Sequence, residues 1–330
     1  GSSGMTKTGE GTLVLAAGTN TYTGGTTINA GQLVMGSFQG LVYGTVTVNT
    51  GATFDMHGYC ALGNPRWAGL FSILNIGGTG SDGSGALLNS VGSIGGVAAG
   101  GYTFLTGTGN QHPTINLTAD TLFNLATDFG QLNGGYTNTY LNLNGHTLTK
   151  RGIGNYYLCH TTVGNGDLLL ANGAIILTKA GGSVGSLIQG TGTVTIGDGA
   201  GNGALSLDVA QTAGLITRPI TLNGGKIVAT NGVAQIDSAM TLNVTNAANT
   251  IDVSFGLTLA GALGGSGGLL KTGAGTLTLT NVNTYCGDTI ISNGTLTVGG
   301  AGQLGGGTYQ SNINNSASFI YASSADQTLS

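Results

Sequence analysis

Short stretches in which polar and apolar residues alternate recur along the chain, and they predict β-strands. Examples are GTLVL at 11–15, GTVTV at 44–48 and GTLTL at 275–279. A period of two places alternate side chains on one face, so each strand buries one side and exposes the other. Gly and Asn between the stretches supply the positive φ values that tight corners need. No window has helical periodicity, so we expect an all-β protein.

Two segments far apart in the sequence carry the same extended pattern. Residues 7–36 and 271–299 both read K-T-G-x-G-T-L-x-L, then N-T-Y-x-G-x-T-x-I, then G-x-L. A third, degenerate copy at 150–177 keeps the lysine, its two following glycines and a later Asn-Gly pair. Self-similarity over such distances indicates that one structural unit is repeated.

Evenly spaced short strands and internal repeats predict a parallel β-helix, or β-solenoid, whose coils stack about 4.8 Å apart. Thr and Asn suit ladders of like residues between coils. At roughly 20–30 residues per coil, the chain gives on the order of 11–16 coils in an elongated rod of about 50–75 Å. An antiparallel sandwich or barrel is the alternative.

The solenoid is expected to be a single domain over residues 5–330. Gly1–Gly4, which precede Met5, are interpreted as the remnant of an expression tag and left out of the fold. The stretch at about 57–140 matches the repeat pattern less well, so we expect loops to project there.

The repeat resembles the passenger-associated transport repeat, also called the autotransporter-associated β-strand repeat. The resemblance is carried by 7–36 and 271–299, with 150–177 as the degenerate third copy. It implies a right-handed parallel β-helix in a large exported protein of a Gram-negative-type bacterium. It further implies a secreted or cell-surface location, associated with the outer membrane in the full-length protein. The family pattern names no catalytic residue, so none is carried over.

Composition narrows the function classes. The 330 residues include 65 glycines, eight basic and twelve acidic residues, with a net charge of −4. This balance argues against a basic nucleic-acid-binding surface. A hydrophobic fraction of 40% argues against a disordered chain. No run of about 18 apolar residues occurs, so we expect no membrane-spanning helix.

Cysteine and histidine give no recognisable metal site. Three cysteines, an odd number without a C-x-x-C pair, exclude a disulfide framework. The nearest metal-like spacings are His57 to Cys60 and the adjacent Cys159 and His160, whereas zinc normally requires three or four ligands. We therefore expect no bound metal and no cofactor.

Three aspartates and one tryptophan are candidate site residues. Asp167 and Asp288 occupy the same repeat position, where a corner role competes with a carboxylate pair acting as acid and base. Asp237 begins a D-S-A tripeptide similar to the aspartic-protease signature, although that chemistry needs two carboxylates sharing a proton. Trp67, in the N-P-R-W segment, is a candidate ligand contact, because exposed aromatic rings stack on sugars.

Three functions remain open. The first is a surface stalk without turnover, and the second is an adhesive segment that binds glycans or host surface glycoproteins. The third is a secreted hydrolase, an acid protease or glycosidase acting on a host glycoprotein such as mucin through Asp carboxylates. Self-association through exposed end coils is also expected. We favour the structural or adhesive role.

Overall fold

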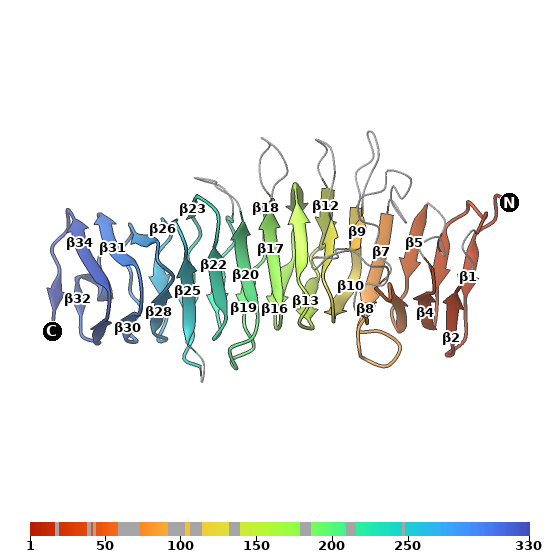
Figure 1. Ribbon diagram of the computed structural model, residues 1–330, viewed down its shortest axis with the longest axis horizontal. Coiled ribbons are helices and arrows are strands. Elements are labelled where there is room, and N and C mark those ends of the chain that lie inside the picture. Colours follow the sequence, from red (N-terminus) through yellow and green to blue (C-terminus); the bar gives the residue numbers. More distant parts are fainter. Residues whose placement is uncertain are drawn as a thin grey trace. The chain divides into compact units, whose positions relative to one another are not determined.

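A computed structural model describes residues 1–16, 20–37, 41, 44–58, 73–91, 103–105, 114–131, 139–178, 186–208, 216–245 and 248–330. Within these residues the regular structure is β-strand, with one short 3₁₀ turn at Gly305–Gly307 (Figure 1). Strands that are neighbours in space are parallel and belong to successive coils. The predicted β-solenoid is therefore confirmed, and the antiparallel alternative is wrong.

The chain forms two compact units, which are described separately. Unit 1 comprises Gly1–Leu168, Gly173–Ile175 and Ala180–Ser186. Unit 2 comprises Leu169–Asn172, Ile176–Lys179 and Leu187–Ser330. Strands β16 (Asp167–Leu170) and β17 (Ala174–Thr178) contain residues of both.

In unit 1, each strand pairs with the equivalent strand of the next coil, which produces columns of parallel strands. One column runs β1–β3–β5–β7–β10–β12–β15, a second runs β2–β4–β6–β8–β10–β13, and a third runs β9–β11–β14. The long strand β10 belongs to two columns. The bounds are β1 Met5–Lys7, β2 Thr12–Leu15, β3 Thr26–Ile28, β4 Gly31–Met35, β5 Thr45–Val48, β6 Ala52–Asp55, β7 Ile73–Gly78, β8 Leu87–Asn89, β9 Thr103–Leu105, β10 Thr114–Leu125, β11 Phe129–Gln131, β12 Thr139–Asn142, β13 Thr147–Arg151, β14 Tyr156–Cys159 and β15 Thr161–Val163.

Unit 2 repeats this arrangement in columns β19–β21–β24–β27, β20–β22–β25–β28–β30–β33 and β23–β26–β29–β31–β34. A pair, β32–β35, follows. The bounds are β18 Leu187–Ile188, β19 Val194–Ile196, β20 Ala204–Asp208, β21 Ile220–Leu222, β22 Lys226–Ala229, β23 Val233–Ile236, β24 Met240–Leu242, β25 Asn249–Val253, β26 Gly256–Leu259, β27 Leu263–Gly264, β28 Leu269–Thr272, β29 Thr276–Leu279, β30 Thr289–Ile291, β31 Thr295–Gly300, β32 Thr308–Tyr309, β33 Ile313–Asn315, β34 Ser318–Ser323 and β35 Thr328–Leu329.

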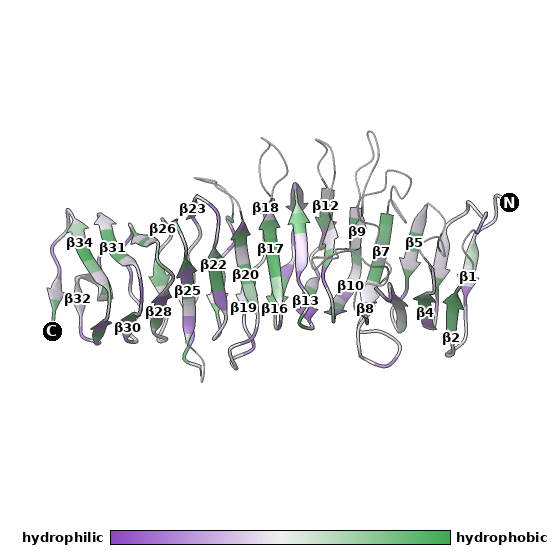
Figure 2. Ribbon diagram, in the orientation of Figure 1, coloured by the Kyte–Doolittle hydropathy of each residue, from purple (hydrophilic) through white to green (hydrophobic). Residues whose placement is uncertain are grey.

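The core consists of inward-facing aliphatic side chains stacked coil upon coil. In unit 2, Leu257, Leu277 and Leu296 occupy one register position on successive coils, and all three are buried. Apolar and more polar residues alternate along the strands in Figure 2, as the period-two pattern predicts. Burying an aliphatic side chain of this size stabilises the fold by about 1.5–3 kcal/mol, so the stacked columns are its main source of stability.

Aromatic residues from the less regular stretch of the sequence contribute to the core. Phe123, Phe129 and Tyr156 are fully buried in unit 1, and the rings of Phe129 and Tyr156 stack with centroids 5.1 Å apart. Residues 73–91 and 114–131 therefore build regular coils. The remainder of the 57–140 stretch, apart from 57–58, 103–105 and 139–140, lies outside the described residues.

Asparagine side chains form ladders between coils. Asn116 Nδ2 donates to Asn75 Oδ1 at 2.9 Å, and Asn142 Nδ2 donates to Asn116 Oδ1 at 2.8 Å. An amide side chain can donate to the coil on one side and accept from the coil on the other. The predicted stacking of like polar residues is thereby confirmed.

The corner glycines of the repeat are packed against the preceding coil. Gly31, Gly173 and Gly294 have φ values of 65°, 66° and 70°. A Cβ atom at Gly31 would lie 2.4 Å from the carbonyl oxygen of Gly11 and 2.5 Å from that of Gly9. The other two copies leave equally little room. Glycine is therefore required for two reasons, its left-handed backbone and its lack of a side chain.

We expect Gly31→Ala to destabilise the first coils by more than the cost of a left-handed alanine alone, which is about 1–2 kcal/mol. Gly9→Ala is the matched control, because Gly9 has a φ of 73° and open space around its Cβ position. Hydrogen exchange of the β4 amides and thermal unfolding would measure the difference. Equal effects of the two substitutions would contradict the packing argument.

Candidate functional site

The lysine of each repeat copy is buried and binds main-chain carbonyls. Lys271 Nζ donates to Thr272 O at 2.7 Å, to Gly273 O at 2.8 Å and, on the next coil, to Asn293 O at 3.1 Å. Lys271 itself is fully buried. The ammonium group thus joins two coils at a corner, where regular strand pairing is interrupted.

The lysines of the other two copies also bind main-chain carbonyls at their corners. Lys7 Nζ donates to Thr8 O at 3.0 Å, to Gly9 O at 2.5 Å and to Ala30 O at 2.9 Å. Lys150 Nζ donates to Arg151 O at 2.8 Å and to Gly152 O at 2.9 Å. The recurring lysine is therefore a structural element, which we call the lysine joint.

Burial makes the joint sensitive to protonation. Desolvation lowers the pKa of Lys150 to about 7, an effect that the negative charge of Asp128 partly offsets. Burial also lowers the pKa of Lys271, with Asp252 acting in the opposite direction. The hydrogen bonds to carbonyl oxygens hold both side chains in place.

A tyrosine–threonine pair marks the next corner of the two complete repeats. The hydroxyls of Tyr22 and Thr26 lie 2.8 Å apart, and those of Tyr285 and Thr289 lie 2.6 Å apart. In the second copy, Tyr309 of the following coil continues the chain of hydroxyls at 2.7 Å from Thr289. The spacing Y-x-x-x-T thus encodes a hydrogen bond within the corner.

A groove in unit 1 lies beside strands β2, β4, β6 and β8. We call it the His57 groove, and its lining is Val14, Ala16, Gln32, Val34, Met35, Gly36, Asp55, His57, Leu88 and Ser90.

The His57 groove encloses a volume of about 650 Å³, against about 320 Å³ for the hollow of unit 2 that is described below. Its floor carries three polar side chains from two coils. Asp55 ends β6, His57 follows it at the corner, and Ser90 follows β8, which pairs with β6. Parallel pairing thus brings together residues that are well separated in the sequence.

The three side chains form a chain of hydrogen bonds. Ser90 Oγ donates to Asp55 Oδ2 at 2.5 Å and lies 3.1 Å from His57 Nδ1. Asp55 Oδ1 accepts from the backbone N–H of His57 at 2.8 Å and from that of Ser90 at 3.2 Å. The Asp55 side chain is 4% exposed, whereas the His57 side chain is 37% exposed. The buried Asp55 carboxylate is therefore well hydrogen-bonded. The His57 ring, at the other end of the chain of hydrogen bonds, is in contact with solvent.

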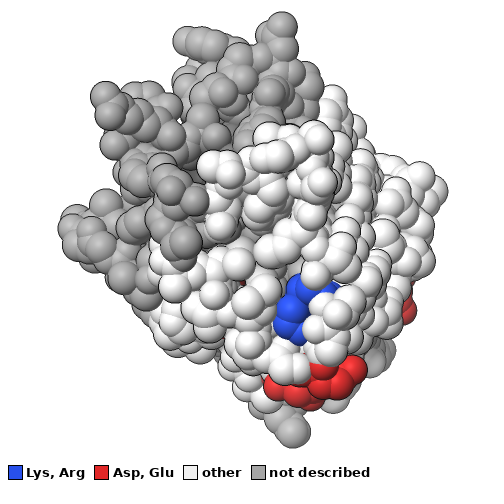
Figure 3. Space-filling model, turned by 90° about the vertical axis from the view of Figure 1, so that its right-hand side faces the viewer, with Lys and Arg blue, Asp and Glu red and all other residues white. Residues whose placement is uncertain are grey.

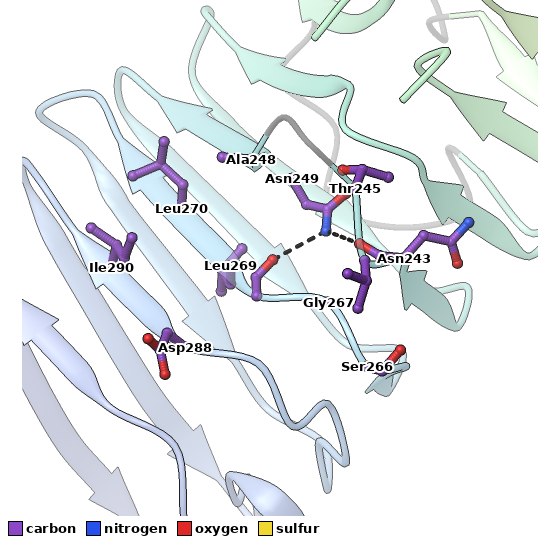
Figure 4. A pocket seen from close by; sticks show the side chains of 12 residues that line it. Asn243, Thr245, Ala248, Asn249, Ser266, Gly267, Leu269, Leu270, Asp288 and Ile290 are labelled. Carbon is purple, nitrogen blue, oxygen red and sulfur yellow. Dashed lines mark hydrogen bonds between the residues drawn. The ribbon is translucent and has the colours of Figure 1, made fainter. Parts of the chain in front are cut away.

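Unit 2 contains the second hollow, which is shown in Figure 4. Its base is held by the buried Asn249, whose Nδ2 donates to Asn243 O at 2.8 Å and to Gly268 O at 3.2 Å. Leu270 and Ile290 of neighbouring strands supply apolar lining. This amide acts as a brace between adjacent coils.

The predicted site residue Asp288 also lines this hollow. It is exposed, and its Oδ1 accepts from the backbone N–H of Asn312 at 2.9 Å and from the side-chain amide of Asn312 at 3.2 Å. The contact links successive coils, as a corner role requires. A catalytic role for Asp288 stays a prediction.

The other three predicted site residues are Asp237, Asp167 and Trp67. Asp237 is exposed after β23 and accepts a hydrogen bond of 2.5 Å from Gln235 Nε2. Asp167 lies half-buried in unit 1, where its backbone N–H donates to His146 O at 3.0 Å. Trp67 lies outside the described residues. Their roles in catalysis or ligand binding stay predictions.

Charged groups are sparse on the face shown in Figure 3, where a basic group lies near acidic groups on a largely uncharged surface. In the described part of the chain, no three His, Cys, Asp or Glu side chains are grouped closely enough to hold a metal ion. No helix of the described residues is long and apolar enough to cross a membrane.

The comparison with known families identifies the repeat. Residues 5–35 and 269–298 match the Passenger-associated-transport-repeat family. They correspond to the two complete copies, each with a lysine joint and a Tyr–Thr pair. The degenerate copy keeps the lysine joint but has Gly164 and Leu168 at the Tyr–Thr positions. The chain thus contains two passenger-associated transport repeats.

A relative of known name supports this assignment. Over 128 residues, covering 36% of this chain, the sequence is 35% identical to the protein named Adhesin BmaC autotransporter of Brucella suis biovar 1 (strain 1330). The match covers 4% of that much longer protein. No solved structure matches the chain. Repeats, solenoid and relative together indicate a passenger-type segment of a secreted or cell-surface bacterial protein.

Sequence reasoning missed the lysine joint and the His57 groove. The joint left a signal, because a lysine recurs at one repeat position in a chain with only eight basic residues. The groove left none, since joining Asp55 to Ser90 requires knowledge of which strands pair.

We expect the stability contributed by Lys150 to depend on pH. Its pKa is about 7 in the folded protein against 10.5 for the ordinary side chain, so the unfolded chain binds more protons between these values. The free energy of unfolding should therefore rise with pH from about 7 to 10.5, by at most about 1.4 kcal/mol per pH unit.

Lys150→Met should remove this contribution while also destabilising the corner, because the carbonyls lose their donor. Denaturant unfolding of both proteins at several pH values would show a difference in stability that grows toward alkaline pH. A difference that does not change with pH would contradict the burial argument.

Proposed function

We propose that the chain is a stalk-forming passenger segment of an autotransporter, displayed outside the cell and associated with the outer membrane through the full-length protein. The transport repeats with their lysine joints carry the proposal. Each coil packs on its sequence neighbours, so coils can add one after another to those already folded. This mode of folding suits a chain that crosses a membrane in an extended form.

An adhesive role is the second part of the proposal. The similar protein of Brucella suis is named an adhesin, and surface stalks present their outward faces to other cells. The partners we propose are glycans or host surface glycoproteins. Grooves on the outer face of a rigid scaffold are suitable places for such contacts.

Self-association is a further proposal, and it concerns strand β34 and its neighbours. Ile320, Tyr321 and Leu329 are 45%, 37% and 51% exposed, on strands that form the edges of their columns. Open strand edges with apolar side chains pair readily with other strands. Light scattering over a range of protein concentrations would measure this association.

The hydrolase alternative has no support from the family match or the relative. Its candidates are Asp237, Asp167 and Asp288. Incubation with mucin and polysaccharides at about pH 4 and pH 7, followed by mass spectrometry, would reveal products if one of these carboxylates acts as a general acid or base.

Surface display is tested on intact bacteria that produce the full-length protein. Antibodies raised against residues 5–330 should label intact cells as strongly as permeabilised cells. A periplasmic protein serves as the control and should be labelled only after permeabilisation. Labelling that requires permeabilisation would overturn the proposed location.

We expect Trp67→Ala to weaken retention of the chain on immobilised mucin by up to about tenfold, since a sugar-stacking aromatic ring contributes on the order of 1 kcal/mol. The midpoint of thermal unfolding should not change. Equal losses of retention and stability would instead make Trp67 a packing residue.

A further inference from the structure

We propose that the His57 groove binds a neutral saccharide. The proposal rests on the adhesive function and names the part of the molecule that makes the contact. One register position on four neighbouring strands is occupied by Val14, Val34, Asp55 and Leu88.

Asp55 interrupts an otherwise aliphatic column. A valine at this position would continue the column and avoid burying a charge, which is costly unless the charge is paired or hydrogen-bonded. Instead, the carboxylate is buried and accepts three hydrogen bonds from residues that begin the two corners. Two of these bonds hold corner N–H groups of successive coils, and the third, from Ser90 Oγ, orients a hydroxyl toward the groove.

The hydrogen-bond chain orients the His57 ring. The Ser90 hydroxyl donates its hydrogen bond to Asp55. Ser90 Oγ therefore acts as the acceptor toward Nδ1–H of His57. The neutral ring then carries its accepting lone pair on Nε2. A buried negative charge behind the serine strengthens this acceptor by polarising the intervening bonds.

The backbone at His57 places its ring beside Ser90. His57 has a φ of 51° and is followed by Gly58 with a φ of 71°. Histidine, like Asn and Asp, adopts left-handed conformations more often than most other residues with a side chain. The corner made by these two residues brings His57 Nδ1 to 3.1 Å from Ser90 Oγ.

The lining fits a neutral sugar. The exposed Val14 and the half-buried Leu88 offer aliphatic surface for the C–H face of a pyranose, and His57, Ser90 and Gln32 offer partners for its hydroxyls. None of the described lining residues is Lys or Arg, so among these residues an acidic sugar would find no cation to offset the Asp55 charge. The volume of about 650 Å³ lies within the usual range of ligand sites, about 300–1,000 Å³.

The test uses the whole chain and two substitutions in the groove. His57→Asn removes the ring but keeps a residue that tolerates positive φ, and Ser90→Ala breaks the hydrogen-bond chain at an exposed position. His146→Asn is the matched control, because His146 is also 37% exposed, with Nδ1 3.8 Å from an Asp120 carboxylate oxygen. Thermal unfolding checks that each variant is folded.

The probes are lactose, maltotriose and chitotriose, with sialyllactose as the acidic comparison. We expect at least one neutral probe to shift the His57 ring resonance in NMR spectra and leave that of His146 unchanged. Its dissociation constant should rise at least tenfold in His57→Asn and Ser90→Ala but not in His146→Asn. Sialyllactose should bind more weakly than lactose.

Two further outcomes separate this inference from the adhesive function. If the parent chain and His57→Asn are retained equally on immobilised mucin and no neutral probe shifts His57, the groove assignment is wrong and the adhesive function stands. If the parent chain is not retained on mucin and binds none of the probes, the groove assignment and the adhesive function are both wrong.

Discussion

The stacking of coils depends on satisfying the main chain at the corners. Along a strand, every N–H and C=O group pairs with the next coil, but at a corner the carbonyls turn away from this ladder. The lysine joint supplies a donor there. Lys271 Nζ binds two carbonyls of its own coil and one of the next, so a single side chain replaces several missing backbone contacts.

The joint also explains the residues around the lysine. Its carbonyl acceptors are brought together by glycine at the left-handed corner, and the next coil approaches so closely that Gly294 has no room for a side chain. Lysine and glycines therefore occur together at this corner in all three copies. Repeats that keep this set preserve the corner even where other positions have changed, as the copy at 150–177 shows.

Sequence predicted the inside of the solenoid better than the outside. Alternation, corner residues and repetition are local, so strands such as β29 and the asparagine ladders followed from general rules. The Asp55–Ser90 contact depends on which strands pair after coils of unequal length, and the lysine role depends on three-dimensional closure of the corner. Neither property is contained in local periodicity.

The inner and outer faces of a solenoid are under different constraints. Inward columns must hold aliphatic side chains of matching size, so the residue type at an inward position is determined by packing. Outward columns do not have to match in size in this way. Their residues can therefore be determined by what the outer face binds. A buried carboxylate at Asp55, between Val34 and Leu88, departs from both the aliphatic column and the usual exposure of Asp. The carboxylate is held there by the corner N–H groups of His57 and Ser90, and the proposed saccharide site would use the polar chain that it begins.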